Sequence, residues 1–331
     1  MDVDEFVAAV EVLRRPELAG LPVVVGGRGD PTERGVVATA SYEARRFGVH
    51  SGTPLRTALR MCPDAVFLPL DRAAYEAASQ EVMNVLRGFT DELEVWGWDE
   101  AFLSVGGDAE SVATSIRQEV AKRTGLSCSV GIGDNKLRAK IAVRFAKPGG
   151  VYRLGAKEWF GVMGDRPVAE LWGIGRKTAR RLRELSIDTV RELAAADPER
   201  LTRTFGRRSG PWLLSLARGE DDSPVSGSPR LARSRSVERT FQEDVEDAVT
   251  IGEEVRRMVD KLAQEAGASD RLVREVAVKI RFAPFTTRTR SVRVKPATAE
   301  QFPLREAAAT ALERFEMTRP VRLVGVRTEL Q

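Results

Sequence analysis

Two adjacent carboxylates interrupt an otherwise apolar, strand-like stretch near residue 100. They are Asp99 and Glu100 in the segment WGWDEAFL, residues 96–103. The apolar residues on either side, 93–95 and 101–103, predict the two arms of a β-hairpin with the turn between them. Neighbouring strand residues point to opposite faces, so only one acid can point directly into a site. The other acid must reach that site from the side or across the turn.

A third acid, Asp2, lies in MDVDEFVAAVE, just before a segment of helical period. Three carboxylates from separate segments can hold two hard divalent cations. The competing interpretation is a solvated turn that carries two acids by chance. A buried strand should precede the helix, yet only Met1 stands before Asp2, whereas strands usually have about 5 residues. We therefore expect the start to be truncated, and a chain with added upstream residues to be more active.

Composition limits the class of protein. With 331 residues, 42% hydrophobic and 30% charged, the chain predicts two to four compact units. It has no apolar run of membrane-spanning length and no leader-like start, which favours the cytoplasm. Cys62 and Cys128 lack metal-ligand spacing and are interpreted as buried thiols, and a single histidine, His50, excludes most histidine zinc sites. The net charge of +4 indicates nucleic acid only if the basic residues are clustered.

The first segments predict a helix from residue 4 to 15, a strand at 21–25, and a strand, turn and helix within GVVATASYEARRFGVHSG. Tyr42 and Arg45 are three residues apart and therefore share a helical face. An aromatic ring and a guanidinium on one face could bind a triphosphate. The alternative is ordinary helix packing beside a surface charge.

Further along, strands alternate with helices between hairpins, which favours a mixed sheet with helices on one side, an α+β arrangement. The expected helices are 53–61, 73–86, 111–122 and 135–145, and the expected strands are 65–68 and 128–132.

The last of these helices carries Lys136, Lys140, Arg144 and Lys147 at intervals of four, four and three. Such intervals place the cations in one stripe on a helix face. A solvated stripe is the alternative. Because the stripe follows the carboxylate hairpin closely, it also fits a site that binds a polyanion beside metals.

A segment of different character begins near residue 166. In LWGIGRKTARRL, Gly173 and Gly175 precede a helix that starts with Arg176 and Lys177. Glycines allow close backbone approach, and a helix N-terminus offers free N–H groups, so this helix-hairpin-helix pattern predicts binding to the phosphates of duplex DNA.

Residues 220–232 are rich in Pro, Gly and Ser and predict a linker. Beyond it the pattern is strand, helix, strand, strand, helix, strand. Apolar residues alternate with polar ones over 276–282, which predicts one apolar sheet face and one exposed basic face. Residues 271–295 hold eight basic residues and one acid. This asymmetry predicts a sheet that follows phosphates without reading sequence.

Together these segments resemble a Y-family DNA polymerase of the DinB, or DNA polymerase IV, type, and most closely its actinobacterial members with a non-aromatic sugar gate. The resemblance covers essentially the whole length through DVDEFVAAVE, SYEARRFGVHSG, WGWDEAFL, SVGIGDNKLRAKIAVRFAKPGG, LWGIGRKTARRL and RSRSVERTF. It implies an α+β multidomain right hand with a mixed-sheet palm, small fingers, a helical thumb and an α/β little finger. The expected boundaries are 1–165 for palm and fingers (fingers about 17–70), 166–221 for the thumb, 222–232 for the linker and 233–331 for the little finger.

The resemblance also implies roles for individual residues. Asp2, Asp99 and Glu100 are the expected catalytic metal ligands for two Mg²⁺ ions, with Mn²⁺ as a substitute. The expected nucleotide contacts are Phe6, Val7, Thr39, Tyr42, Arg45 and Lys147. The expected DNA contacts are Lys136, Lys140, Gly173, Gly175, Arg176, Lys177, Arg233, Arg235, Lys279, Arg281, Arg288 and Arg290.

Other expectations concern substrates and partners. Most relatives have an aromatic residue at the position of Val7, so the smaller side chain predicts use of ribonucleotides along with deoxynucleotides. We expect a monomer that binds primer-template DNA and nucleoside triphosphates. Dependence on a sliding clamp is doubtful, because the chain ends at VRTELQ without a clamp-binding tail. The alternatives are a catalytically weak polymerase-like scaffold that binds DNA, and a nucleotidyl cyclase.

Overall fold

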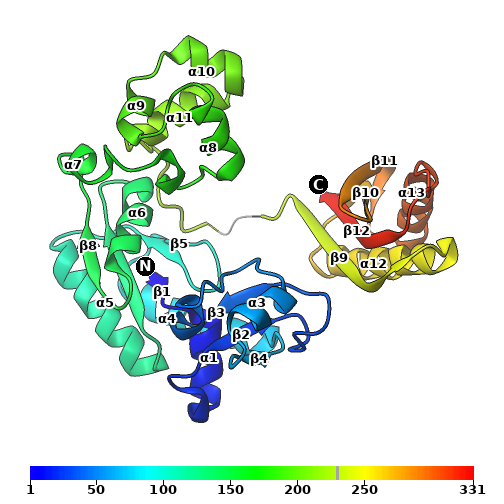
Figure 1. Cartoon of the computed structure of the whole chain (residues 1–331), viewed down its shortest axis with the longest axis horizontal. Coiled ribbons are helices and arrows are strands. Elements are labelled where there is room, and N and C mark those ends of the chain that lie inside the picture. The colour runs from blue at the N-terminus through cyan, green and yellow to red at the C-terminus, as the bar shows by residue number, and fades with distance from the viewer. Residues whose placement is uncertain (229–230) are drawn as a thin grey trace. The chain divides into compact units, whose positions relative to one another are not determined.

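The computed structural model describes residues 1–228 and 231–331. The chain forms two compact units, one made of residues 1–24, 39–46 and 71–229, the other of 25–38, 47–70 and 230–331. Figure 1 shows the helices and strands of both. Within the described residues, no helix is both long and apolar enough to cross a membrane. The expected linker at 222–232 includes residues 229 and 230, which lie outside the described part of the chain.

The acid-bearing part of the first unit is a small mixed sheet backed by helices. In the three-stranded sheet β1-β7-β8, β1 runs antiparallel and β8 parallel to β7, while β5 and β6 form a separate hairpin. Helix α6 packs on β7 and β8, and α5 packs on β7 and α4. This confirms the α+β expectation. The elements are β1 Asp2–Val3, α1 Phe6–Arg14, α4 Arg72–Arg87, β5 Leu93–Val95, β6 Ala101–Leu103, α5 Ala109–Thr124, β7 Cys128–Ile132, α6 Lys136–Ala146 and β8 Val151–Arg153.

The strand expected before the first helix is only two residues long. In β1, Asp2 lies opposite Ser129 and Val3 opposite Cys128 of β7. On its other side, Asp2 forms a bridge with Glu100, and the Val3 amide donates to the Asp99 carbonyl at 2.8 Å. This short strand therefore brings the first acid next to the acids of the hairpin.

Residues 16–68 form a second small sheet with strand order β3-β2-β4. The expected strand at 21–25 is found at Val23–Gly26. The elements of this region are η1 Pro16–Leu18, β2 Val23–Gly26, β3 Val37–Ala40, α2 Tyr42–Arg45, α3 Leu55–Met61 and β4 Val66–Leu68.

Residues 159–217 are helical and share one apolar core with α6. Leu182, Leu193, Leu201 and Leu213, one from each of four helices, are fully buried in it. Short helices of this kind are stable because they bury such faces together. The elements are α7 Trp159–Met163, η2 Val168–Glu170, α8 Arg176–Arg183, α9 Val190–Ala194, α10 Pro198–Phe205 and α11 Ser209–Ala217.

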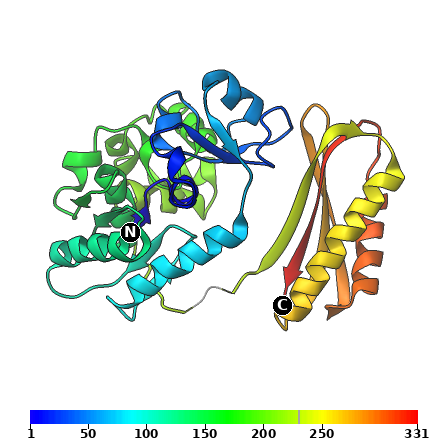
Figure 2. The ribbon, with the colours of Figure 1, turned by 90° about the horizontal axis from the view of Figure 1, so that it is seen from below.

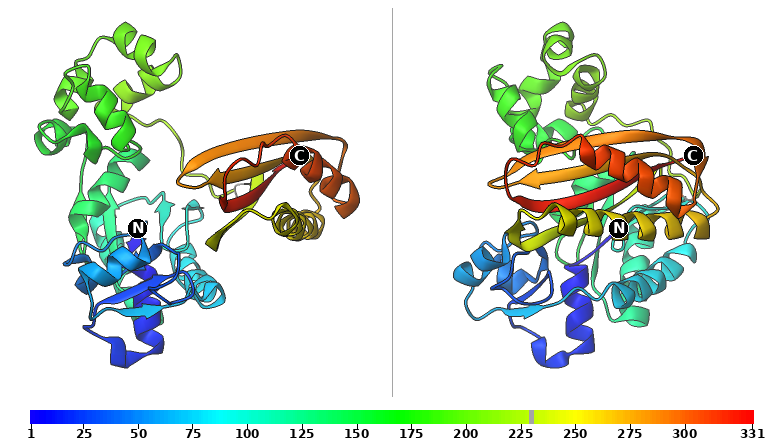
Figure 3. Two further views of the ribbon diagram at one scale, coloured as in Figure 1. Left: turned by 45° about the vertical axis from the view of Figure 1, so that its right-hand side comes forward. Right: turned by 90° about the vertical axis from the view of Figure 1, so that its right-hand side faces the viewer.

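The C-terminal region has the predicted order of strands and helices. Its sheet is fully antiparallel with strand order β11-β10-β12-β9. Figures 2 and 3 show α12 and α13 along one face of this sheet, where their apolar residues form the core with Val276, Val278 and Ile280. The elements are β9 Ser234–Val245, α12 Ala248–Ala268, β10 Val273–Phe282, β11 Thr286–Thr298, α13 Gln301–Glu313 and β12 Val321–Leu330.

Candidate active site

The predicted hairpin carries the two neighbouring acids at its turn. Strands β5 and β6 pair as expected, with Val95 opposite Ala101. The turn is closed by the Trp96 amide, which donates to the Glu100 carbonyl at 3.0 Å. Since Asp2 forms a backbone bridge with Glu100, the two segments that carry the three predicted ligands lie side by side, although they are about 100 residues apart in the chain.

Two lysine ammonium groups contact these acids. Lys140 of α6 donates to Asp2 at 3.1 Å and also to Glu100, and Lys147, just after α6, donates to Asp2 at 2.5 Å. The structure thus places two members of the predicted basic stripe at the carboxylates. A site that attracts ammonium groups at this position is suited to cationic ligands.

The electrostatics of the acids differ. Burial alone raises the pKa of Asp2, but Lys147 and Lys140 outweigh burial and lower this pKa below its usual value. The pKa of Asp99 is raised, first by burial and then by the negative charges of Asp2 and Glu100. Negative charge therefore accumulates at Asp99 without an equal compensation.

This donor set fits divalent metal ions. Carboxylate oxygens are the ligands that Mg²⁺ prefers, and a cation near Asp99 would offset the like charges that raise its pKa. In the described parts of the chain, no three or more acid, histidine or cysteine side chains already surround one point. Asp2 and Glu100 instead bond the two lysines.

The predicted triphosphate contacts lie on and beside α2. The Arg45 guanidinium lies 5.0 Å from the centroid of the Tyr42 ring, and its Nε donates to the Ala40 carbonyl at 2.9 Å. Thr39 is half-buried in the preceding strand β3. The predicted shared face of Tyr42 and Arg45 is therefore present. Burial, followed by the charge of Asp4, raises the pKa of Tyr42, so its hydroxyl stays protonated.

Sequence reasoning missed two acids that hold Tyr42. The Tyr42 hydroxyl donates to Asp4 at 3.3 Å, and its amide donates to the Glu5 carboxylate. Glu5 has a φ of 40°, a left-handed conformation that turns the chain from β1 into α1. The sequence signal that could have indicated Asp4 is its position two residues after Asp2, which places both acids on the same face of an extended segment.

The two neighbouring residues of α1 differ in exposure. Phe6 is only 2% exposed and packs in the core, so we correct its assignment as a nucleotide contact. Apolar burial explains its position, because the helical period directs this ring inward. Val7 is half-buried, so part of its surface is accessible.

Lys136 also departs from its expected role. Its side chain is 8% exposed, and its ammonium bonds Glu94 at 2.9 Å and the Pro224 carbonyl at 2.9 Å. The Ser226 amide donates to the same carboxylate at 3.2 Å. A buried lysine held in this way cannot reach DNA. It connects the hairpin to the first residues of the expected linker.

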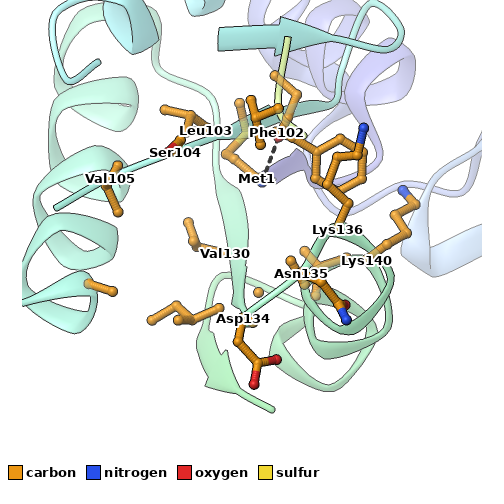
Figure 4. Close-up of a pocket in the computed structure, with 18 of the residues that line it drawn as sticks. Met1, Phe102, Leu103, Ser104, Val105, Val130, Asp134, Asn135, Lys136 and Lys140 are labelled. Carbon is orange, nitrogen blue, oxygen red and sulfur yellow. Dashed lines mark hydrogen bonds between the residues drawn. The ribbon is translucent and has the colours of Figure 1, made fainter. Parts of the chain in front are cut away.

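A cavity of about 450 Å³ lies between β6, β7, α5 and α6 (Figure 4). Leu103 and Val105 lie on one side and Val130 on the next strand, while Lys140 is at the edge shared with the acids. The walls are largely apolar, and neither Tyr42 nor the other predicted triphosphate contacts line this cavity. It is therefore separate from the triphosphate contacts.

The helix-hairpin-helix turn has the geometry that the pattern predicts. Gly173 has a φ of 96°, and a Cβ at this position would approach the Trp212 ring to 3.0 Å. Gly175 immediately precedes α8, and Arg176 and Lys177 in the first turn of this helix are exposed. Glycine is thus required at 173, and the cations of α8 are accessible to phosphates.

The predicted basic face of the C-terminal sheet is divided between two faces. Ile280 is buried under the helices, so its neighbours Lys279 and Arg281 point to the open face. Arg288 lies directly opposite Ile280, and Arg290 follows two residues later on the same face. Paired residues share a face, so Arg288 and Arg290 lie on the helix side and not beside Lys279 and Arg281.

Arg235 is also on the helix side, where it approaches Glu265 of α12 at 3.5 Å. Arg290 lies 5.6 Å from the Phe315 ring centroid, and Arg233 is exposed just before β9. We therefore correct the single predicted face: of the predicted contacts in β9, β10 and β11, Lys279 and Arg281 occupy the open face.

Three family models match consecutive parts of the chain. The impB/mucB/samB family matches residues 1–144, the DNA polymerase-iota thumb domain 169–221, and the impB/mucB/samB family C-terminal domain 232–329. An acid-bearing mixed sheet, a helix-hairpin-helix region and a four-stranded C-terminal region thus occur in the order of one known family.

Similar proteins cover the whole chain. DNA polymerase IV 2 of Mycobacterium tuberculosis is 50% identical over 335 residues, covering 100% of this chain and 96% of that protein. Among solved structures, the Y-family DNA polymerase chimera Dbh-Dpo4(243-245)-Dbh has a TM-score of 0.88 at 27% identity, covering 99% of this chain and 97% of its own. An insertion ternary complex of Dbh DNA polymerase has a TM-score of 0.69 with the same identity and coverage.

The chain belongs to the Y family of DNA polymerases. Within that family it is of the DNA polymerase IV, or DinB, type, which confirms the resemblance seen in the sequence.

Proposed function

We propose that the chain extends a primer on a DNA template by transferring a nucleotide from a nucleoside triphosphate to the primer 3′-hydroxyl, as a translesion polymerase. The observation that carries this proposal is the bridge between Asp2 and Glu100, which joins the three acids beside two lysines. Family membership supports the reaction, since similar proteins are DNA polymerases.

Asp2, Asp99 and Glu100 would hold two Mg²⁺ ions, or Mn²⁺ in their place. When bound, these ions lower the pKa of the primer hydroxyl and neutralise charge on the departing pyrophosphate. The role of the three acids would be to bind the two ions and to fix their positions. Positioning and charge stabilisation require no general base from a protein side chain, and we assign none to the single histidine, His50.

The remaining residues act by positioning and by charge. Tyr42, Arg45 and Lys147, together with Thr39, would hold the triphosphate, since positioned side chains and cations stabilise the negative charge that moves during transfer. Lys140 would lie beside the primer-template. Val7 would leave space for a ribose 2′-hydroxyl.

For DNA, we propose that the helix-hairpin-helix turn and α8 bind the duplex backbone, together with the open face of the C-terminal sheet. We also retain the domain boundaries proposed from the sequence: palm and fingers 1–165, thumb 166–221, linker 222–232 and little finger 233–331. The family matches at 169–221 and 232–329 support the thumb and the little finger, respectively.

Primer extension tests the proposal. With Mg²⁺ or Mn²⁺, the natural chain should add nucleotides to a primer, and Asp99→Ala should reduce the rate by more than about 100-fold, since even outer partners of metal ligands contribute roughly 10–100-fold. Glu110→Gln, at an exposed position on α5, is the control and should extend normally. DNA binding without extension by the natural chain would favour the scaffold alternative.

A further inference from the structure

Asp4 is a buried carboxylate whose two oxygens are both fully bonded. It is 3% exposed. Oδ1 accepts from the Ser129 hydroxyl at 2.8 Å and the Tyr42 hydroxyl at 3.3 Å. Oδ2 accepts from the Ser127 hydroxyl at 2.8 Å and the Gly149 amide at 2.9 Å. Each oxygen thus accepts two hydrogen bonds from neutral donors, which uses the four acceptor positions of the carboxyl group.

Two of these donors belong to segments that carry nucleotide contacts. The Tyr42 hydroxyl belongs to a side chain that is predicted to contact the triphosphate. The Gly149 amide lies two residues after Lys147, whose ammonium bonds Asp2. The two serines belong to the sheet, with Ser129 directly opposite Asp2 in the β1–β7 pair. Asp4 therefore connects the α2 side chain, the segment after α6 and the strand that bears the first acid.

The geometry points to Asp4 as a positioning residue that fixes Tyr42 and Lys147 relative to Asp2. It touches neither substrate nor metal in this assignment. It acts through the hydroxyl of one nucleotide contact and through the backbone beside the other. This inference rests on the proposed function, because it gives a purpose to the position of residues assigned to the triphosphate.

The chemistry of the four donors predicts unequal effects of two substitutions. Asp4→Asn keeps the size but replaces one oxygen by an NH₂ donor. Hydroxyl groups can accept as well as donate, so Tyr42 and Ser129 can adapt to that NH₂, while the Gly149 amide can only donate. The Asn oxygen should therefore face Gly149 and preserve the Lys147 segment. Asp4→Ala removes both connections.

The test measures equilibrium binding of dATP to the full chain on a dideoxy-terminated primer opposite template dT, so that no chemistry is required. We expect Asp4→Ala to weaken dATP binding about tenfold, since hydrogen bonds to charged groups have the strength for such a change. Asp4→Asn should weaken it by only about two- to threefold by the same principle. Primer-template affinity should change less than twofold in both.

Coupling to Tyr42 distinguishes positioning from general loss of structure. If Asp4 acts through the hydroxyl, Tyr42→Phe should weaken dATP binding less in the Asp4→Ala background than in the natural chain. Glu11→Gln is the matched control, because Glu11 is another fully buried acid, bonded to Arg14, Arg15 and Tyr75 and to none of the four groups that bond Asp4. It should lower thermal stability without changing dATP affinity.

The outcomes separate this inference from the proposed function. If the natural chain binds no dATP on the primer-template, the proposed function fails and Asp4 has no such role. If the natural chain binds dATP and both Asp4 variants bind it equally well, the positioning role is wrong while the function stands. Should Asp4→Ala fail to fold, Asp4→Asn still decides through its effect on dATP binding and its coupling to Tyr42→Phe.

Discussion

The acids of the candidate site differ in the cations they already contact. Asp2 bonds two lysines, and its pKa is lowered, whereas Asp99 has a raised pKa beside two like charges. Asp99 is therefore the acid that gains most from an added cation. Glu100 shares Lys140 with Asp2.

Val7 gives a prediction about the sugar. It is half-buried on α1, and a larger side chain there should occupy the space proposed for a 2′-hydroxyl. We expect Val7→Phe or Val7→Tyr to lower the efficiency of ribonucleotide use relative to deoxynucleotide use by about tenfold or more, through steric exclusion. Single-nucleotide insertion kinetics with ATP and dATP measure this ratio.

The matched control for this prediction is Leu13→Phe, an exposed position on the same helix. It should leave the ratio unchanged. Ribonucleotide use that is already as low as in an aromatic-gated polymerase, with no response to either Val7 variant, would contradict the sugar-gate assignment.

The thiols give a prediction about pH. Burial is the main cause that raises the pKa of Cys128 to about 11, and burial also raises the pKa of Cys62. The folded chain then keeps a proton that the unfolded chain loses above about pH 9. Because the unfolded state binds fewer protons, the free energy of unfolding should fall between about pH 9 and pH 11.

Thiol titration and denaturation measure these effects. Both cysteines should react slowly with a thiol reagent at pH 8 in the native chain and rapidly in denaturant. Cys128→Ala should reduce the loss of stability at alkaline pH. Fast labelling of Cys128 in the folded chain would show that the thiol is accessible.

At the scale of elements, the hairpin is connected to α6 and to residues 224–226 by the buried Glu94–Lys136 pair. Replacing one member of such a pair usually costs about 3–5 kcal/mol, because the other charge stays buried. We expect Lys136→Met to destabilise the chain by this amount and to speed hydrogen exchange of the Ser226 amide. Urea unfolding and exchange measurements test both effects.

The double variant Glu94→Gln with Lys136→Met is the control, since it removes both charges. It should recover most of the lost stability. If Lys136→Met alone is neutral, the pair does not hold this element in place.

The two faces of the C-terminal sheet give a second prediction for an element. Replacing Lys279 and Arg281 by Gln should weaken DNA binding and reduce the slope of log affinity against log salt by roughly 0.9 for each lost phosphate contact. The matched pair Arg288→Gln with Arg290→Gln, on the helix side, should have a smaller effect. Equal losses from both pairs would contradict the division of the faces.

These cases also show what the sequence could predict. The hairpin at 93–103, the order of elements after the linker and the position of Gly173 follow from local patterns, and the structure confirms them. The role of Lys136 could not be predicted. Lys136 and Lys140 belong to the same stripe of helical period, so spacing does not distinguish them, and the partner of Lys136, Glu94, lies 42 residues away in the chain. The same limit applies to Asp4, whose donors come from three distant segments.

The prediction of a single basic face was wrong for a related reason. Alternation along β10 predicts which of its residues are buried, but it does not predict the register of β11. Register depends on the turn between the strands, and a shift of one residue moves every side chain to the other face. The sequence therefore gives the number of basic residues correctly, but the prediction that they share one face is wrong.

At the scale of the whole molecule, three family matches follow one another along the chain. Their order explains why the class of protein could be predicted more completely than the contacts of individual site residues. Each motif is weak alone, and their order along 331 residues is specific. The individual contacts depend on pairings between those motifs. Such pairings are long-range, so spacing within a motif carries little information about them.

The connection between the hairpin and residue 226 also sets a length. Ser226 is held at Glu94, and β9 begins at Ser234, so eight residue steps remain, with a maximal extension of about 26–29 Å. If the Glu94–Lys136 pair were lost, the next residue bonded to an earlier element would be Glu220, whose amide donates to the Ser215 carbonyl at 2.9 Å. Fourteen steps would then separate Glu220 from Ser234, so the maximal extension of this segment would rise to about 46–50 Å. The buried ion pair thus limits how many residues lie between the last bonded residue before β9 and the start of that strand.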